Sequence, residues 1–151
     1  MDSRQINDEY TEIAHQLIDE RKELEHLRYA NISIICLSSE HAKKKGDAKV
    51  FGQCERVPEK YKWSVPCDFT ITIFEPNIEG FTDEQLKILI FHELLHVGYD
   101  CGNLFIRQHD LEDFKLIIDE YGTDWAEVKR YGDDVPEGTK EEEETQEDDI
   151  L

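Results

Sequence analysis

Residues 83–97 read DEQLKILIFHELLHV, and this stretch decides the fold. After the first turn nearly every position is apolar, so the segment predicts a helix that is buried on all sides. Three ionisable side chains, His92, Glu93 and His96, interrupt the apolar run. Burying such groups costs free energy unless a partner compensates them, so the pattern indicates that something binds there.

The ends of this helix are marked in the sequence. Thr82, followed three residues later by Gln85, forms the capping-box pattern of a helix N-terminus. Gly98 is the residue type that most often ends a helix, so we expect the helix to run to about Val97. A turn-rich loop containing Gly102 is then expected to lead to the next helix.

Three upstream segments have the composition of β-strands. Residues 68–74, DFTITIF, alternate apolar and polar side chains with the period of a half-buried strand. The Ile-rich segment 31–39 predicts a second strand, and 48–54 predicts a third that Gly52 interrupts. Residues 41–45, HAKKK, precede a glycine and are typical of a solvated loop.

Further helices are expected on both sides of these elements. Residues 7–29 space their apolar side chains at helical intervals among Glu, Lys and Arg. The apolar spacing in HDLEDFKLIIDEYG predicts another helix between His109 and Gly122. Thr123 then has the character of a cap for a short final helix.

Length and charge indicate the domain organisation. The chain of 151 residues suits one domain, which we assign to residues 1–132. Residues 133–151 hold ten acidic residues and one Lys, a net charge of −9 within the chain's total of −19. Such a segment has little apolar surface to bury, so we expect an acidic, disordered tail.

Composition also argues against several classes of protein. The chain lacks the basic face that a nucleic-acid binder needs. It has no apolar run of 18 residues and no signal-peptide pattern, so we expect a cytoplasmic protein without a membrane partner. No CxxC motif occurs, and we expect the four thiols to be reduced and mostly buried: Cys36, Cys54, Cys67 and Cys101.

The three ionisable residues of the buried helix form the motif His-Glu-x-x-His. Side chains four residues apart lie on one helix face, so His92 and His96 can both bind one metal ion, at about 2.0–2.1 Å for zinc. Glu93 follows the first histidine directly and therefore projects beside the metal, where it can act on a water molecule. Zinc coordination would offset the desolvation of both histidines.

A catalytic zinc ion usually has three protein ligands, so a third must come from elsewhere in the chain. His109 is the remaining histidine downstream, and imidazole suits zinc. Asp110 and Asp113 compete for this role. Asp113 can instead accept a hydrogen bond from His109 and orient it, while Asp110 can simply stabilise the start of a helix.

Four motifs in order, RVPEKYK, DFTITIF, LIFHELLHV and HDLEDF, resemble the family named "putative phage metallopeptidases", small zincin-like proteins of bacteriophages and prophages. The resemblance covers residues 32–121. It implies an α+β, minimal zincin-like fold in which a small mixed sheet packs on the buried helix. It also implies that zinc binds His92 and His96, that Glu93 is catalytic, and that His109 is the natural candidate for the third ligand.

The sequence therefore predicts a zinc-dependent metallopeptidase that hydrolyses protein or peptide substrates in the cytoplasm of a host bacterium. We expect the strand at 68–74 to line the cleft and pair with an extended peptide. Tyr99 is a candidate oxyanion stabiliser, although simple packing beside the helix end explains it equally well. The alternative function is a non-catalytic, zinc-stabilised interaction protein, which would have four protein ligands on its metal.

Overall fold

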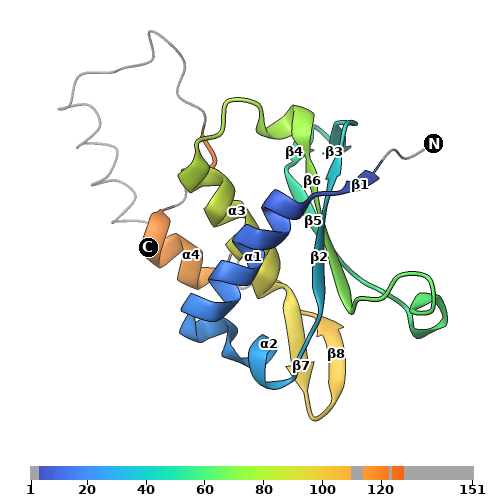
Figure 1. Ribbon diagram of the computed structural model, residues 1–151. Coiled ribbons are helices and arrows are strands. Elements are labelled where there is room, and N and C mark those ends of the chain that lie inside the picture. The colour runs from blue at the N-terminus through green and yellow to red at the C-terminus, as the bar shows by residue number, and fades with distance from the viewer. Residues whose placement is uncertain (1–3, 110–113, 123, 128–151) are drawn as a thin grey trace, which may run out of the picture.

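A mixed four-stranded sheet is the scaffold of the protein (Figure 1). The computed structural model describes residues 4–109, 114–122 and 124–127. β2 and β6 are parallel, and both outer pairs are antiparallel, so the expected α+β class with a mixed sheet is confirmed. The strands, in spatial order, are β1 (Arg4–Ile6), β2 (Ile34–Ser39), β6 (Phe69–Phe74) and β5 (Gly52–Arg56).

The two faces of the sheet differ. On the inner face, Cys36, Ile71 and Ile73 are fully buried under the helices, which all lie on one side of the sheet in Figure 1. On the outer face, Arg4 donates hydrogen bonds to Glu55 and Thr72. A sheet with one covered face and one polar face is typical of antiparallel pairing.

The helical character predicted for residues 7–29 is confirmed, but the segment is interrupted at Arg21. Arg21 adopts an extended conformation, φ −90° and ψ 122°. Its guanidinium lies 4.4 Å from the centroid of the Phe91 ring and binds Glu120, contacts that hold the chain out of helical geometry. The resulting elements are α1 (Asp8–Glu20), a 3-10 turn (Lys22–Leu24) and α2 (Glu25–Tyr29).

The helix that carries the motif, α3 (Asp83–Leu95), begins as predicted. The Thr82 hydroxyl accepts from the Gln85 backbone N–H at 3.1 Å, and the Gln85 side chain accepts from the Thr82 N–H at 2.8 Å. Apolar side chains along α3 are buried against the sheet and α1, as expected for an apolar helix: Ile88, Leu89, Ile90, Phe91, Leu94 and Leu95.

Gly98 does not cap α3, and the loop predicted after it is a β-hairpin. β7 (Val97–Asp100) follows the helix directly and pairs with β8 (Asn103–Ile106). Gly98 lies opposite Phe105, and a β-carbon on it would stand 2.3 Å from the Phe105 ring. The glycine is therefore required by close cross-strand packing and not by a helix terminus.

The lysine-rich segment is also a hairpin, not the solvated loop that was expected. β3 (Lys43–Lys45) pairs with β4 (Ala48–Val50) through a turn at Gly46, whose φ is 64°. Buried Asn77, in the 3-10 turn η3 (Glu75–Ile78), donates to the carbonyls of Lys43 and Val50 and so fastens both hairpin strands. The strand expected over 48–54 divides at Phe51 into β4 and β5.

In the described C-terminal part, α4 spans Lys115–Tyr121. The helix was expected from about His109, but His109 lies before it and is not helical. Gln85 donates to the carbonyls of Trp125 and Glu127, which ties this segment to the start of α3. Asp110, Asp113, Thr123 and the acidic segment 133–151 lie outside the described residues. All four cysteines are free in the structure; Cys36 and Cys67 are buried as expected, whereas Cys54 is partly buried and Cys101 is exposed.

Candidate metal centre

α3 positions two of the three histidines. His92 and His96 are one helical turn apart, and their ring centroids lie 5.2 Å from each other. Both are partly buried at the end of a helix whose other faces are packed. The helix therefore presents two imidazoles from a rigid, well-anchored element.

The hairpin after α3 brings the chain back to these histidines. The Arg107 N–H donates to the His96 carbonyl at 2.6 Å, just beyond the end of β8. Nδ1 of His96 lies 2.7 Å from the Arg107 carbonyl, which can only accept, so Nδ1 carries the proton. Nε2 of His96 is then the nitrogen that can bind a metal, because the hydrogen bond to one ring nitrogen selects the tautomer.

His109 follows two residues after this connection and joins the cluster. Its Nε2 lies 2.9 Å from Nε2 of His92, and the His96 and His109 ring centroids are 4.5 Å apart. One nitrogen from each of the three histidines falls within 4.8 Å of the others. The ligand nitrogens of a tetrahedral zinc site are separated by about 3.3 Å, which follows from its bond lengths, so this donor set fits a metal ion.

Aromatic side chains form a wall beside the cluster. The Phe114 ring lies 5.3, 5.0 and 5.3 Å from the rings of His92, His96 and His109, respectively. The Trp125 ring lies 6.2 Å from His92. An apolar shell of this kind limits water access and strengthens electrostatic interactions at a metal. From its spacing alone Phe114 is predicted only as an apolar helix residue, and its place in the HDLEDF motif is the one sequence signal for its position beside the histidines.

Glu93 is buried, with an exposed fraction of 4%. Its side chain points toward β5, where Gly52 leaves room for it: a β-carbon at position 52 would stand 3.3 Å from Glu93 Cγ and Oε2. The pKa of the neighbouring Cys54 thiol is raised, mainly by burial and secondly by the negative charge of Glu93. A carboxylate thus lies on the helix next to the histidine cluster, largely removed from water.

The other predicted features of the site have separate outcomes. Tyr99 lies on β7 and is 41% exposed, and its role stays a prediction, as do those of Asp110 and Asp113. The expectation that the strand at 68–74 pairs with a peptide is wrong, because β6 is interior and already paired with both β2 and β5. β5 is the outer strand on the side of α3, and it contacts Glu93 through Gly52.

A mixed sheet, a buried His-Glu-x-x-His helix and a third converging histidine define a small α+β protein of the zincin-like class. More specifically, the chain belongs to the family described as "Putative phage metallopeptidase", whose model matches residues 3–136. No curated protein and no solved structure matches the chain. None of the helices formed by the described residues has the length and apolar character that crossing a membrane requires.

Proposed function

We propose that the protein is a zinc-dependent peptidase with His92, His96 and His109 as its metal ligands and Glu93 as its catalytic base. The observation that carries the proposal is the convergence of three imidazoles beside a buried carboxylate. Family membership supports the same reaction class. Three protein ligands leave one tetrahedral position open, which is the arrangement of catalytic rather than structural zinc.

Zinc is the metal that best fits this donor set, because three neutral imidazoles suit it and no thiol or carboxylate joins the described cluster. When bound, zinc supplies Lewis-acid activation of a water molecule and of a carbonyl group. The Arg107 carbonyl holds the His96 ring in the required orientation. Phe114 excludes bulk water from one side of the centre.

Glu93 performs the proton transfers in the proposed mechanism. Its carboxylate accepts a proton from the attacking water and then gives it to the leaving amine, which completes hydrolysis of the peptide bond. Burial between α3 and β5 restricts the side chain to few positions, so little reorganisation precedes the transfer. Packing against Gly52 confines the Glu93 side chain.

The proposed substrate is an extended protein or peptide segment that lies along β5. Edge strands offer unpaired backbone groups that can bind a peptide without selecting its sequence. β5 replaces the strand at 68–74 in this role because it is the outer strand of the sheet and is adjacent to Glu93. Side-chain preference must then come from pockets beside β5.

The Glu93→Gln variant tests the proposal. We expect it to bind zinc as the wild type does and to lose hydrolysis of a quenched fluorescent peptide library, because the amide cannot accept the proton. Loss of zinc along with activity would instead make Glu93 a ligand or a structural residue. If wild-type, zinc-loaded protein cleaves no peptide and zinc removal unfolds it, the non-catalytic zinc-stabilised alternative is correct.

A further inference from the structure

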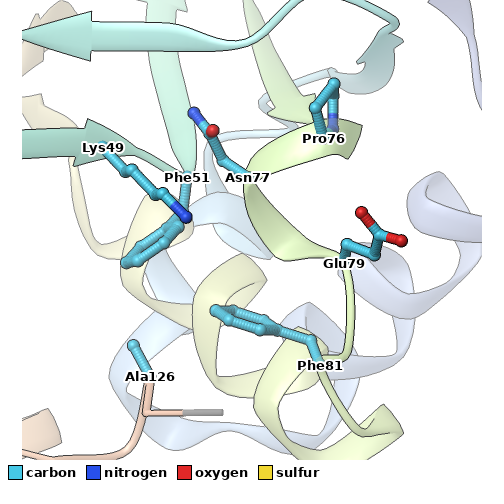
Figure 2. Close-up of a pocket in the computed structure, with 7 residues that line it drawn as sticks. All are labelled: Lys49, Phe51, Pro76, Asn77, Glu79, Phe81 and Ala126. Carbon is cyan, nitrogen blue, oxygen red and sulfur yellow. The ribbon is translucent and has the colours of Figure 1, made fainter.

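A cavity of about 360 Å³ opens at the start of β5, away from the three histidines (Figure 2). One wall comes from the β4–β5 junction, another from η3 and the segment before α3, and a third from the described C-terminal segment. Its lining residues are Lys49, Phe51, Pro76, Asn77, Glu79, Phe81 and Ala126.

Two of these walls contain a residue that is next in sequence to a residue beside the metal centre. Phe51 directly precedes Gly52, which contacts Glu93. Ala126 directly follows Trp125, whose ring faces His92. Because one residue of extended chain spans about 3.3 Å, a peptide lying along β5 past Gly52 reaches Phe51 in the cavity wall within one or two residues. The cavity is therefore placed to receive a substrate side chain near the cleaved bond.

The rim of the cavity on the β4 side is positively charged. Lys49 lines the cavity and lies directly opposite Lys44 across the β3–β4 hairpin, so both side chains lie on one face of the hairpin and Lys45 lies on the other. Like charges in opposite positions of a hairpin are unfavourable. Within the described residues, neither Lys49 nor Lys44 forms an ion pair and both are exposed, so their charge is available to a ligand.

The interior of the cavity is aromatic on one side. The Phe51 and Phe81 rings lie 5.3 Å apart and are tilted by 53°. Figure 2 shows the Lys49 side chain reaching over the Phe51 ring from the β4 side, while the Glu79 carboxylate, on the η3 side, is turned away from both phenylalanine rings. A side chain with a short apolar stem and a terminal carboxylate matches this combination, since the stem can pack on the rings while the carboxylate reaches Lys49.

We infer that this cavity is a substrate subsite in which Lys49 selects an acidic side chain, glutamate in particular, close to the cleaved bond. The inference rests on the proposed peptidase function and adds a substrate class to it. Glutamate is preferred to aspartate because its longer stem can span the Phe51 ring. Glu79 lines the opposite rim with its carboxylate turned away from the rings, so it does not take the place of the substrate carboxylate beside Lys49.

The test uses the full-length, zinc-loaded protein and a peptide library in which each position in turn is fixed as Glu, Gln or Lys. We expect one position near the cleaved bond to favour Glu over Gln by roughly two- to fivefold in kcat/KM, the range for an exposed ion pair. Lys49→Met should abolish this preference, and Lys49→Glu should turn it toward Lys. Glu79→Gln should keep the preference for Glu.

Lys87→Glu is the matched control, because it changes the net charge as Lys49→Glu does but lies on the side of α3 that faces α1. It should leave the preference unchanged. If Lys87→Glu also loses the preference, the preference comes from the net charge of the protein and the subsite is overturned. Equal rates for Glu and Gln at every position, with cleavage intact, would also overturn the subsite while leaving the peptidase function standing.

If no cleavage occurs, a binding measurement tests the subsite separately from the peptidase function. Fluorescence anisotropy of the Glu and Gln library peptides on the Glu93→Gln variant, with and without Lys49→Met, reports on the cavity directly. Tighter binding of Glu peptides that depends on Lys49 supports the subsite even if the peptidase function fails. No difference between the peptides, or tighter binding of a single-stranded DNA probe through the same lysine, overturns it.

Discussion

Gly52 on β5 and Glu93 on α3 are packed so closely that a β-carbon on Gly52 would stand 3.3 Å from two atoms of the Glu93 side chain, Cγ and Oε2. The same β-carbon would also stand 3.3 Å from Ile73 Cδ1. The position of the carboxylate is thus set jointly by the helix that carries it and by the strand that faces it.

Gly52→Ala should therefore displace Glu93 without removing it. We expect the variant to fold and bind zinc normally but to lose roughly tenfold or more in kcat, because small misplacements of a catalytic group are costly. Zinc affinity, measured by chelator competition, is the internal control. Unchanged kcat with a normal structure would mean that the carboxylate position does not limit the reaction.

His109→Ala should weaken zinc binding strongly, because only His92 and His96 would remain from the cluster. Asp113→Asn should weaken it by about 10- to 100-fold if Asp113 orients His109. His15→Ala, on the exposed face of α1, is the control and should bind zinc as the wild type does. A chelator competition titration on all three variants gives the comparison. Wild-type affinity for His109→Ala together with a large loss for Asp113→Asn would make the carboxylate the third ligand.

Gly98→Ala should destabilise the β7–β8 hairpin. The added methyl group overlaps the Phe105 ring, so we expect a loss of about 1–3 kcal/mol in the free energy of unfolding. Phe105→Ala should cost little by itself, since that ring is 44% exposed. Urea unfolding of both single variants and the double variant provides the measurement. The double variant should recover most of the loss, and additive effects would place the strain elsewhere.

The Arg21–Glu120 pair gives a pH-dependent prediction. A hydrogen bond from Arg21 lowers the pKa of Glu120 below its ordinary value of 4.5. The stabilisation is therefore present above that value and is lost as the pH falls through the lowered pKa. At pH 7, Glu120→Gln should cost about 0.2–1 kcal/mol, as for other exposed pairs. Urea unfolding should show a smaller difference from the wild type at pH 3 than at pH 7.

Local signals explain which parts of the fold could be predicted. The start of α3 depends on Thr82 and Gln85, three residues apart, and the spacing of His92 and His96 follows from helix geometry. All of these interactions lie within one helix, so the sequence contains their full cause. The same is true of the period-2 pattern that predicted β6.

Contacts between distant residues explain the errors. The break after α1 depends on Phe91 and Glu120, about 70 and 100 positions beyond Arg21. The lysine hairpin depends on Asn77, which lies 34 residues after Lys43. Strand alternation is the same for interior and outer strands, so it could not reveal that β6 is covered on both edges. His109 was selected by residue type and resemblance, because no local pattern joins it to α3.

The paired hydrogen bonds between His96 and Arg107 lie between the hairpin tip and the metal centre. They close the loop below the tip, directly before the segment that carries His109. At the tip, Cys101 and Gly102 both have positive φ, and a β-carbon on Gly102 would meet nothing within 4 Å. The tip is accordingly a suitable insertion point. Added residues, an epitope or a fused reporter can be accommodated there without displacing the three histidines.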